Sequence, residues 1–122
     1  MNFIKSNTDF ISRLLHSQQQ VHVFHLASRS YSQHKALEEY YTKIGDLLDT
    51  YTEAFQGAHG LLKDYKTYPI INNVKKVVVY FQDLLKKINK VKIPKGDTSL
   101  NNILDSIYQL IYQTLYKLKY LK

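Results

Sequence analysis

Apolar side chains recur at helical spacing over residues 32–55, and this pattern limits the fold more than any other feature of the chain. Steps of three and four residues place such side chains on one face of an α-helix. The residues on this face are Leu37, Tyr41, Ile44, Leu48, Tyr51 and Phe55. No proline occurs in the first 56 residues to interrupt a helix. The pattern predicts a long amphipathic helix from about Ser32 to Phe55, with Gly57 as its C-cap.

Three other segments are expected to be helical. The first ends at about Ala27, after an apolar face that includes Leu15 and Leu26, and residues 28–32 form a serine-rich break. The next spans about residues 69–91, because Pro69 suits a first helical turn. The last follows the loop at residues 93–97. The expected caps of the first and last helices are Thr8 or Ser6, and Thr98 or Ser99.

These segments predict one all-α domain over residues 1–122. Residues 58–67 form a weaker segment, interpreted as a helical turn or a crossover. Four helices with short loops and one longer central connection fit a ferritin-like four-helix bundle as well as an up-down bundle. We expect no membrane association, because no apolar run approaches the roughly 18–20 residues of a membrane span. A bacterial host cytoplasm or a phage particle is the expected location.

Composition restricts the chemistry of any site. The chain has no cysteine, which excludes disulfides, thiolate zinc sites and iron–sulfur clusters, so a metal must be held by histidines and carboxylates. No glycine-rich phosphate loop is present, which disfavours nucleotide-binding enzymes. The formal net charge is +7, and most lysines follow Gly60. This asymmetry is compatible with contact with DNA, and a solvated lysine-rich surface is the alternative.

Histidines and carboxylates line one flank of the long helix. Taking 100° per residue, Glu38, Asp49 and Glu53 lie at roughly 40°, 60° and 100° from His34. Two histidines of the first helix, His22 and His25, are further candidate ligands. Mixed histidine and carboxylate ligation suits iron or manganese, with zinc as a competitor. Boundary acids of an amphipathic helix and half-buried histidines are the alternative interpretation.

The candidate ligands are too far apart to share an ion within one chain. At a rise of about 1.5 Å per residue, His34 and Asp49 are about 22 Å apart along the helix. A two-fold partner that packs the same helix antiparallel would bring His34 of one chain opposite Asp49 and Glu53 of the other. The sequence therefore predicts a homodimer through this helix, with two equivalent sites.

The run from His34 to Tyr41, followed by Asp49 and Glu53, resembles the pattern of Dps-type mini-ferritins. His22, twelve residues before His34, stands where that family has its first-helix histidine, and His25 competes for the same role. The stretch also resembles small phage ferritin-like proteins. The resemblance implies a ferroxidase centre at a subunit interface, oxidation of Fe(II) by peroxide, and assembly into a hollow shell. His34, Asp49 and Glu53 would then be catalytic, with Glu38 in support.

Two functions are favoured by the sequence. One is a metal-binding, ferroxidase-type protein, as a dimer or a larger shell. The other is a non-enzymatic structural or scaffold protein, such as a component of a phage particle, in which the metal site is vestigial and no cofactor is bound. A basic nucleic-acid-binding module is a third, less supported reading.

Overall fold

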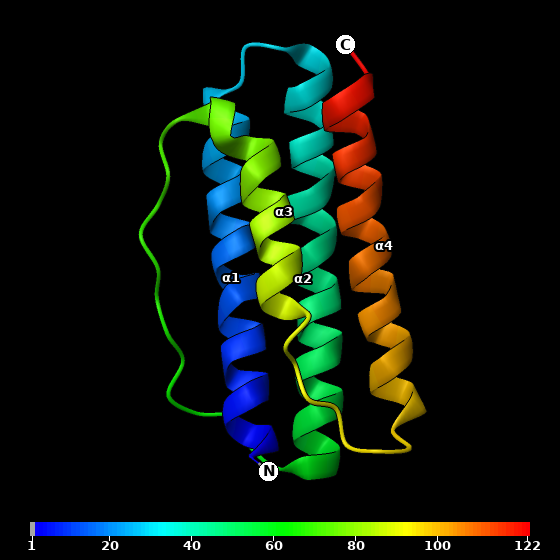
Figure 1. Cartoon of the computed structure of the whole chain (residues 1–122). Coiled ribbons are helices and arrows are strands. Elements are labelled where there is room, and N and C mark those ends of the chain that lie inside the picture. Colours follow the sequence, from blue (N-terminus) through cyan, green and yellow to red (C-terminus); the bar gives the residue numbers. More distant parts are fainter. Residues whose placement is uncertain (1) are drawn as a thin grey trace.

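The computed structural model describes residues 2–122 as an all-α protein, which confirms the predicted class. Its four helices are α1 (Phe3–Ala27), α2 (Tyr31–His59), α3 (Val77–Ile88) and α4 (Thr98–Tyr120), and a short 3-10 turn, η1 (Val74–Lys76), precedes α3 (Figure 1). No strand occurs within residues 2–122. None of the helices described is both long and apolar enough to cross a membrane.

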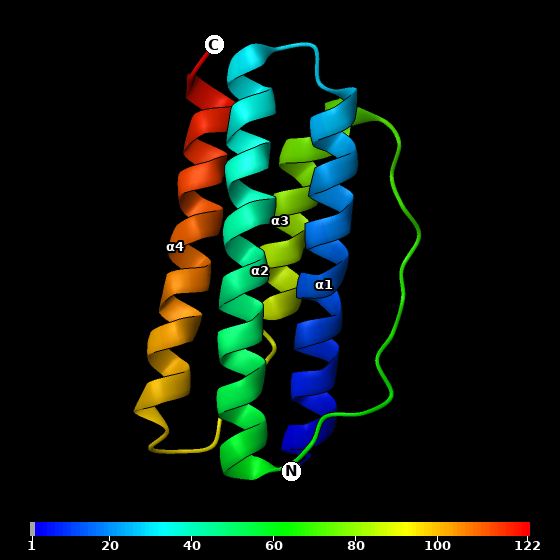
Figure 2. The same ribbon diagram turned by 180° about the vertical axis from the view of Figure 1, so that it is seen from behind.

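The helices pack side by side with one long connection. Helix α1 contacts α2 and α3, while α4 contacts α2 and α3. Figures 1 and 2 show that α2 and α3 run in the same direction, because residues 60–73 return along the full length of the bundle. The segment expected as a helical turn or a crossover is this return connection, and it contains no helix.

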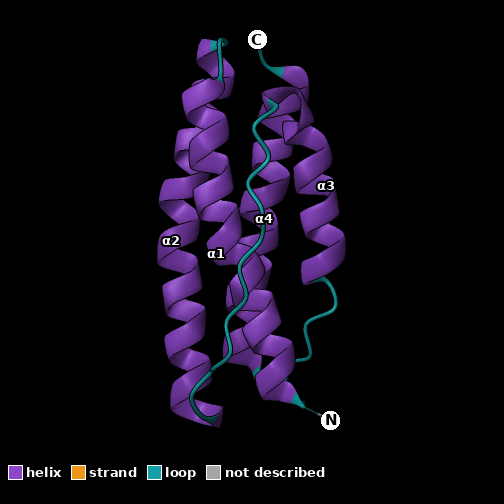
Figure 3. Ribbon diagram, turned by 90° about the vertical axis from the view of Figure 1, so that its left-hand side faces the viewer, coloured by secondary structure: helices purple, strands orange, loops and turns teal. Residues whose placement is uncertain are grey.

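Residues 60–73 form an extended strap over α1 (Figure 3). The backbone N–H of Lys66 donates to the Ser12 hydroxyl at 2.9 Å. The buried Gln20 side chain accepts from the N–H of Ile71 at 2.7 Å and donates to its carbonyl at 2.8 Å. The two bonds with Gln20 occupy the backbone N–H and carbonyl of Ile71, so Ile71 makes no intrahelical bond, and α3 begins at Val77 and not at Pro69 as predicted.

The bundle core is built from apolar residues of all four helices. The largest fully buried side chains of α1 and α2 are Phe24, Tyr40, Tyr51 and Phe55. Tyr40 lies in the core, whereas Tyr41, which was predicted on the inner face, is only half-buried. Both core tyrosines have polar partners: the Tyr51 hydroxyl donates to Asn7 Oδ1 at 2.6 Å, and the Tyr40 hydroxyl lies 2.7 Å from Ser17 Oγ. Burial raises the pKa of both.

Several helix termini differ from the prediction. Helix α1 is capped by Asn2, whose side chain accepts from the Lys5 N–H, and not by Thr8 or Ser6. Asp97 caps α4 in place of Thr98 or Ser99. The C-terminal end of α2 also differs: the helix continues past Gly57 to His59, and its C-cap is Gly60, which has a φ of 115°. A positive φ favours glycine, and Gly57 does not adopt one.

Candidate metal centre

A short turn brings the end of α1 against the start of α2. Only residues 28–30 separate the helices. Ser30 is the N-cap of α2 and its hydroxyl accepts from the Gln33 N–H, while the Ser28 hydroxyl donates to the Gln33 side chain at 2.8 Å. Serine satisfies the free backbone donors of a helix start, so the turn can be this tight. It places His25 of α1 beside His34 of α2.

The ring of each of these two histidines is hydrogen-bonded to the backbone carbonyl of the other. Nδ1 of His25 donates to the His34 carbonyl at 2.8 Å, and Nδ1 of His34 donates to the His25 carbonyl at 3.0 Å. The rings stack with centroids 3.6 Å apart. A carbonyl oxygen can only accept, so the Nδ1 of each ring carries a proton, and the neutral form of each ring presents the lone pair of Nε2. Metal-bound histidines are commonly oriented in this way.

Glu38 adds a carboxylate to the pair. It lies one helical turn after His34, so both side chains project from the same flank of α2. One ligand atom from each of His25, His34 and Glu38 lies within 4.8 Å of the others. His25 is 6% exposed, and the other two residues are half-buried. Three such donors suit a transition-metal ion, with further positions left for water or a second ligand set.

The neighbouring acid, Glu39, is engaged elsewhere. Its carboxylate accepts from Lys117 of α4 and from Lys43, each at 2.6 Å. These hydrogen bonds, the one from Lys117 first, lower the pKa of Glu39 to about 2. By contrast, the ion pair of Glu38 with Lys35 is long, at 3.5 Å. Glu38 is therefore the carboxylate of this turn that is available to a metal.

His22 lies beside the cluster but outside it. Its ring stacks on Tyr41 with centroids 4.2 Å apart and meets the His25 ring at 5.9 Å. Of the two first-helix candidates, it is His25 that contacts His34 directly. His22 is exposed and one turn away, which makes it the next imidazole available to an additional ion.

Asp49 and Glu53 lie at a distance from the histidines within one chain. Both are exposed and line a shallow hollow with Leu15, Leu48 and Tyr65. They follow His34 on the same straight helix by 15 and 19 residues, so at least about 22 Å separates them from it. A single chain thus assembles three of the six predicted ligands and leaves the two distal carboxylates on an open surface.

The other two histidines have structural roles. His16 contacts the Tyr80 hydroxyl at 2.9 Å and the Pro69 carbonyl at 3.0 Å, which fastens the strap. His59 pairs with Asp97 at 2.7 Å and joins the end of α2 to the start of α4. The Leu100 N–H and His59 lower the pKa of Asp97.

Sequence reasoning missed the reciprocal backbone bonds that fix the two rings. The sequence signal that could have indicated them is the nine-residue separation of His25 and His34 across a serine-rich break. That separation places the last turn of one helix against the first turn of the next only if the break is three residues long.

Comparison with known proteins gives a family without an assigned activity. No curated protein and no solved structure matches the chain. The profile of a family of unknown function, DUF5856, matches residues 25–118, a region that includes His25, His34, Glu38, Asp49 and Glu53. This match covers well over half of the chain, and the chain belongs to the DUF5856 family.

Proposed function

We propose that this protein is a ferritin-like metalloprotein that binds iron at His25, His34 and Glu38 and oxidises Fe(II) at a site completed by a second copy of the chain. The observation that carries the proposal is the cluster itself. Two imidazoles with their Nδ1 protons engaged and a carboxylate one turn away form a pre-oriented donor set. A solvated surface histidine needs no such arrangement.

The helix topology supports a ferritin-like bundle. A single long crossover between the second and third helices, with helices α2 and α3 parallel, is the connection that distinguishes ferritin-like folds from up-down bundles. The strap at residues 60–73 is such a crossover (Figure 1). Ferritin-like proteins build their metal sites from side chains on facing helices, as α1 and α2 would do here.

The surface around the cluster supports a two-fold partner. Leu15 and Leu26 were predicted as core positions, but both are exposed, with Leu26 at 72%. They are eleven residues apart, which is close to three helical turns, and His22 falls on the same stripe of α1. An antiparallel partner would cover these leucines and bring its own Asp49 and Glu53 to His34 and Glu38.

The proposed chemistry uses iron as the substrate. Two Fe(II) ions would each give one electron to a peroxide, whose O–O bond breaks with uptake of two protons to form two water molecules. Carboxylates favour the harder Fe(III) product, which suits Glu38 together with Asp49 and Glu53. Manganese and zinc fit the same donors, and zinc would occupy the site without turning over.

Metal content of purified variants tests the proposal. Wild-type protein loaded anaerobically with Fe(II) and desalted should retain about one to two ions per chain, measured by elemental analysis. His34→Gln and Glu38→Gln should each lower this content at least tenfold, because even the loss of a side chain that only orients a metal ligand typically costs about 10–100-fold in affinity. Peroxide consumption, followed by the absorbance of Fe(III), should fall in parallel.

His59→Gln is the matched control. His59 also contacts a carboxylate, but it lies at the opposite end of α2 from the cluster. The His59→Gln variant should retain the metal content of the wild-type protein. A wild-type protein that holds no metal after loading would overturn the proposal and favour the non-enzymatic scaffold. Bound iron without peroxide consumption would limit the function to metal binding.

A further inference from the structure

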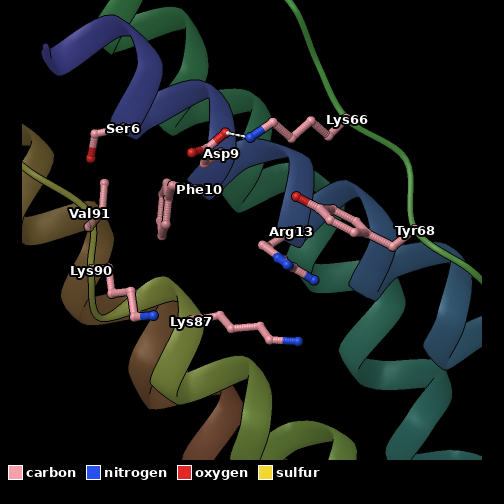
Figure 4. Close-up of a pocket in the computed structure, with 9 residues that line it drawn as sticks. All are labelled: Ser6, Asp9, Phe10, Arg13, Lys66, Tyr68, Lys87, Lys90 and Val91. Atoms are coloured by element: carbon pink, nitrogen blue, oxygen red, sulfur yellow. Dashed lines mark ion pairs between the residues drawn. The ribbon is translucent and has the colours of Figure 1, made fainter.

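A basic cleft lies under the strap, on the side of α1 that faces α3. Figure 4 shows its lining: Arg13 comes from α1, Lys66 from the strap, and Lys87 and Lys90 from the end of α3 and the residues just after it. The cleft has a volume of about 200 Å³, and the buried Phe10 ring forms part of its wall. It is separate from the proposed metal centre, whose residues are not among its lining.

The four cations of the cleft are only partly neutralised. Lys66 pairs with Asp9 at 2.8 Å, and Lys87 pairs with Asp83 at 2.7 Å. The Arg13 guanidinium lies over the Tyr68 ring, 3.6 Å from its centroid, and has no carboxylate partner within residues 2–122. Lys90 likewise forms no ion pair in the part of the chain described. Two positive charges therefore remain for an external anion.

The position of Arg13 is fixed by its neighbours. Its stacking on Tyr68 holds the guanidinium against the strap, and the strap is itself bonded to α1 by Ser12 and Gln20. A planar guanidinium held in this way keeps its N–H donors in place for the oxygens of an oxyanion. Burial lowers the pKa of the nearby His16, and the charges of Arg13 and Lys87 lower it further.

The size of the cleft limits its ligand. It is larger than the roughly 30 Å³ share of one water molecule but smaller than the ~300–1,000 Å³ of a site for a drug-sized molecule. Arginine and lysine together are the usual donors to phosphate oxygens, which carry more charge than a carboxylate and offer more acceptors. The cleft therefore fits one phosphate group better than a larger acid.

We propose that this cleft binds the phosphate group of a small molecule, either free phosphate or the phosphate end of a nucleotide, through Arg13 and Lys90. The binding is independent of the proposed metal centre. Lys66 and its partner Asp9 form the rim next to the strap.

Titration calorimetry with sodium phosphate and with AMP tests the proposal, at constant ionic strength set with sodium chloride and without added metal. Wild-type protein should bind at least one of the two. Lys90→Gln and Arg13→Gln should each weaken binding at least tenfold. Equal affinity for phosphate and AMP would identify the phosphate group alone as the ligand, and at least tenfold tighter binding of AMP would identify a nucleotide.

Lys75→Gln is the control, because Lys75 is exposed and lies outside the cleft. It should leave binding unchanged. Arg13→Gln also removes the contact with Tyr68, so Lys90→Gln decides the result if the arginine variant is poorly folded by circular dichroism. The proposal is overturned if neither ligand binds, or if Lys75→Gln weakens binding as much as Lys90→Gln. Binding to a DNA duplex alone would also overturn it and would indicate a general lysine-rich surface.

Discussion

Two backbone carbonyls determine which nitrogen of His25 and of His34 is protonated. Most histidines on a helix surface can exchange between tautomers in water, but each of these has its Nδ1 proton bound to the other residue's carbonyl. The stacked rings add a packing restraint. The free nitrogen of each ring is therefore Nε2 before any metal arrives, which reduces the ordering that binding would otherwise require.

Asp97 offers a test of stability at a single residue. Its side chain accepts from the Leu100 N–H at 3.0 Å as the N-cap of α4 and also contacts His59. Asp97→Ala should lower the free energy of unfolding by about 1 kcal/mol at pH 7, the usual value of a lost cap. Urea denaturation followed by circular dichroism measures it.

The effect of Asp97 should also depend on pH. Because its pKa is lower in the folded protein than the ordinary value of 3.8, its stabilisation is complete above that value and is lost as the pH falls through the folded value. The difference between wild type and Asp97→Ala should therefore shrink below about pH 4. Asp105→Ala, at an exposed position within α4, should not destabilise the protein, because alanine is the better helix former. An equal loss in both variants, or a difference that persists at low pH, would contradict the capping role.

The sequence predicted which residue types would meet at the α1–α2 turn but not how they would meet. The stripe of His34 and Glu38 followed from helical periodicity, which depends only on local spacing. The choice between His22 and His25 could not be made, because it depends on how many residues the serine-rich break uses. The exposure of Leu15 and Leu26 could not be predicted either. Both share the helical spacing of the core residues, but they lie on a face of α1 that no other described helix covers.

Among the elements, the strap is where the observed fold differs most from the predicted one. The four helices, whose apolar residues recur at helical spacing, were predicted in the correct number and order. The helical interpretation of residues 69–73 was wrong because tertiary bonds to α1 outweigh the preference of Pro69 for a first turn. Helix ends are also set by the side chains that cap them, and the observed caps Asn2 and Asp97 differ from the candidates predicted for the first and last helices.

Gln20 should control the attachment of the strap. It is fully buried and makes both a donor and an acceptor bond to the backbone of Ile71. Gln20→Ala would leave both backbone groups without partners, and we expect a loss of about 1–3 kcal/mol in the free energy of unfolding. Proteolysis within residues 60–73 and exchange of the Ile71 amide should both become faster.

Gln19→Ala is the control for the strap, because Gln19 is the adjacent residue of α1 and is exposed. The free energy of unfolding of Gln19→Ala should match that of wild type within about 0.5 kcal/mol. Its rate of proteolysis within residues 60–73 should also equal that of wild type. Similar cleavage rates in the two variants would mean that Gln20 does not hold the strap.

At the scale of the whole molecule, the proposed ligands separate into two groups along α2. His25, His34 and Glu38 lie at the end next to the α1–α2 turn, while Asp49 and Glu53 lie about four turns away in an open hollow. If two copies of α2 packed antiparallel, the first group of one chain would lie next to the second group of the other. In the proposed dimer, a complete centre therefore needs residues of both chains.

Complementation between two inactive variants tests whether the metal centre is shared between chains. A tagged His34→Gln/Glu38→Gln chain is co-expressed with a differently tagged Asp49→Ala/Glu53→Ala chain, and the mixed dimer is isolated through both tags and verified by native mass spectrometry. Its iron content after loading is compared with that of each variant alone. We predict that both homodimers hold little iron, whereas the mixed dimer, which has one intact site, holds about half of the wild-type amount. A mixed dimer as empty as its parents, or full wild-type iron in the Asp49→Ala/Glu53→Ala protein, would contradict a shared centre.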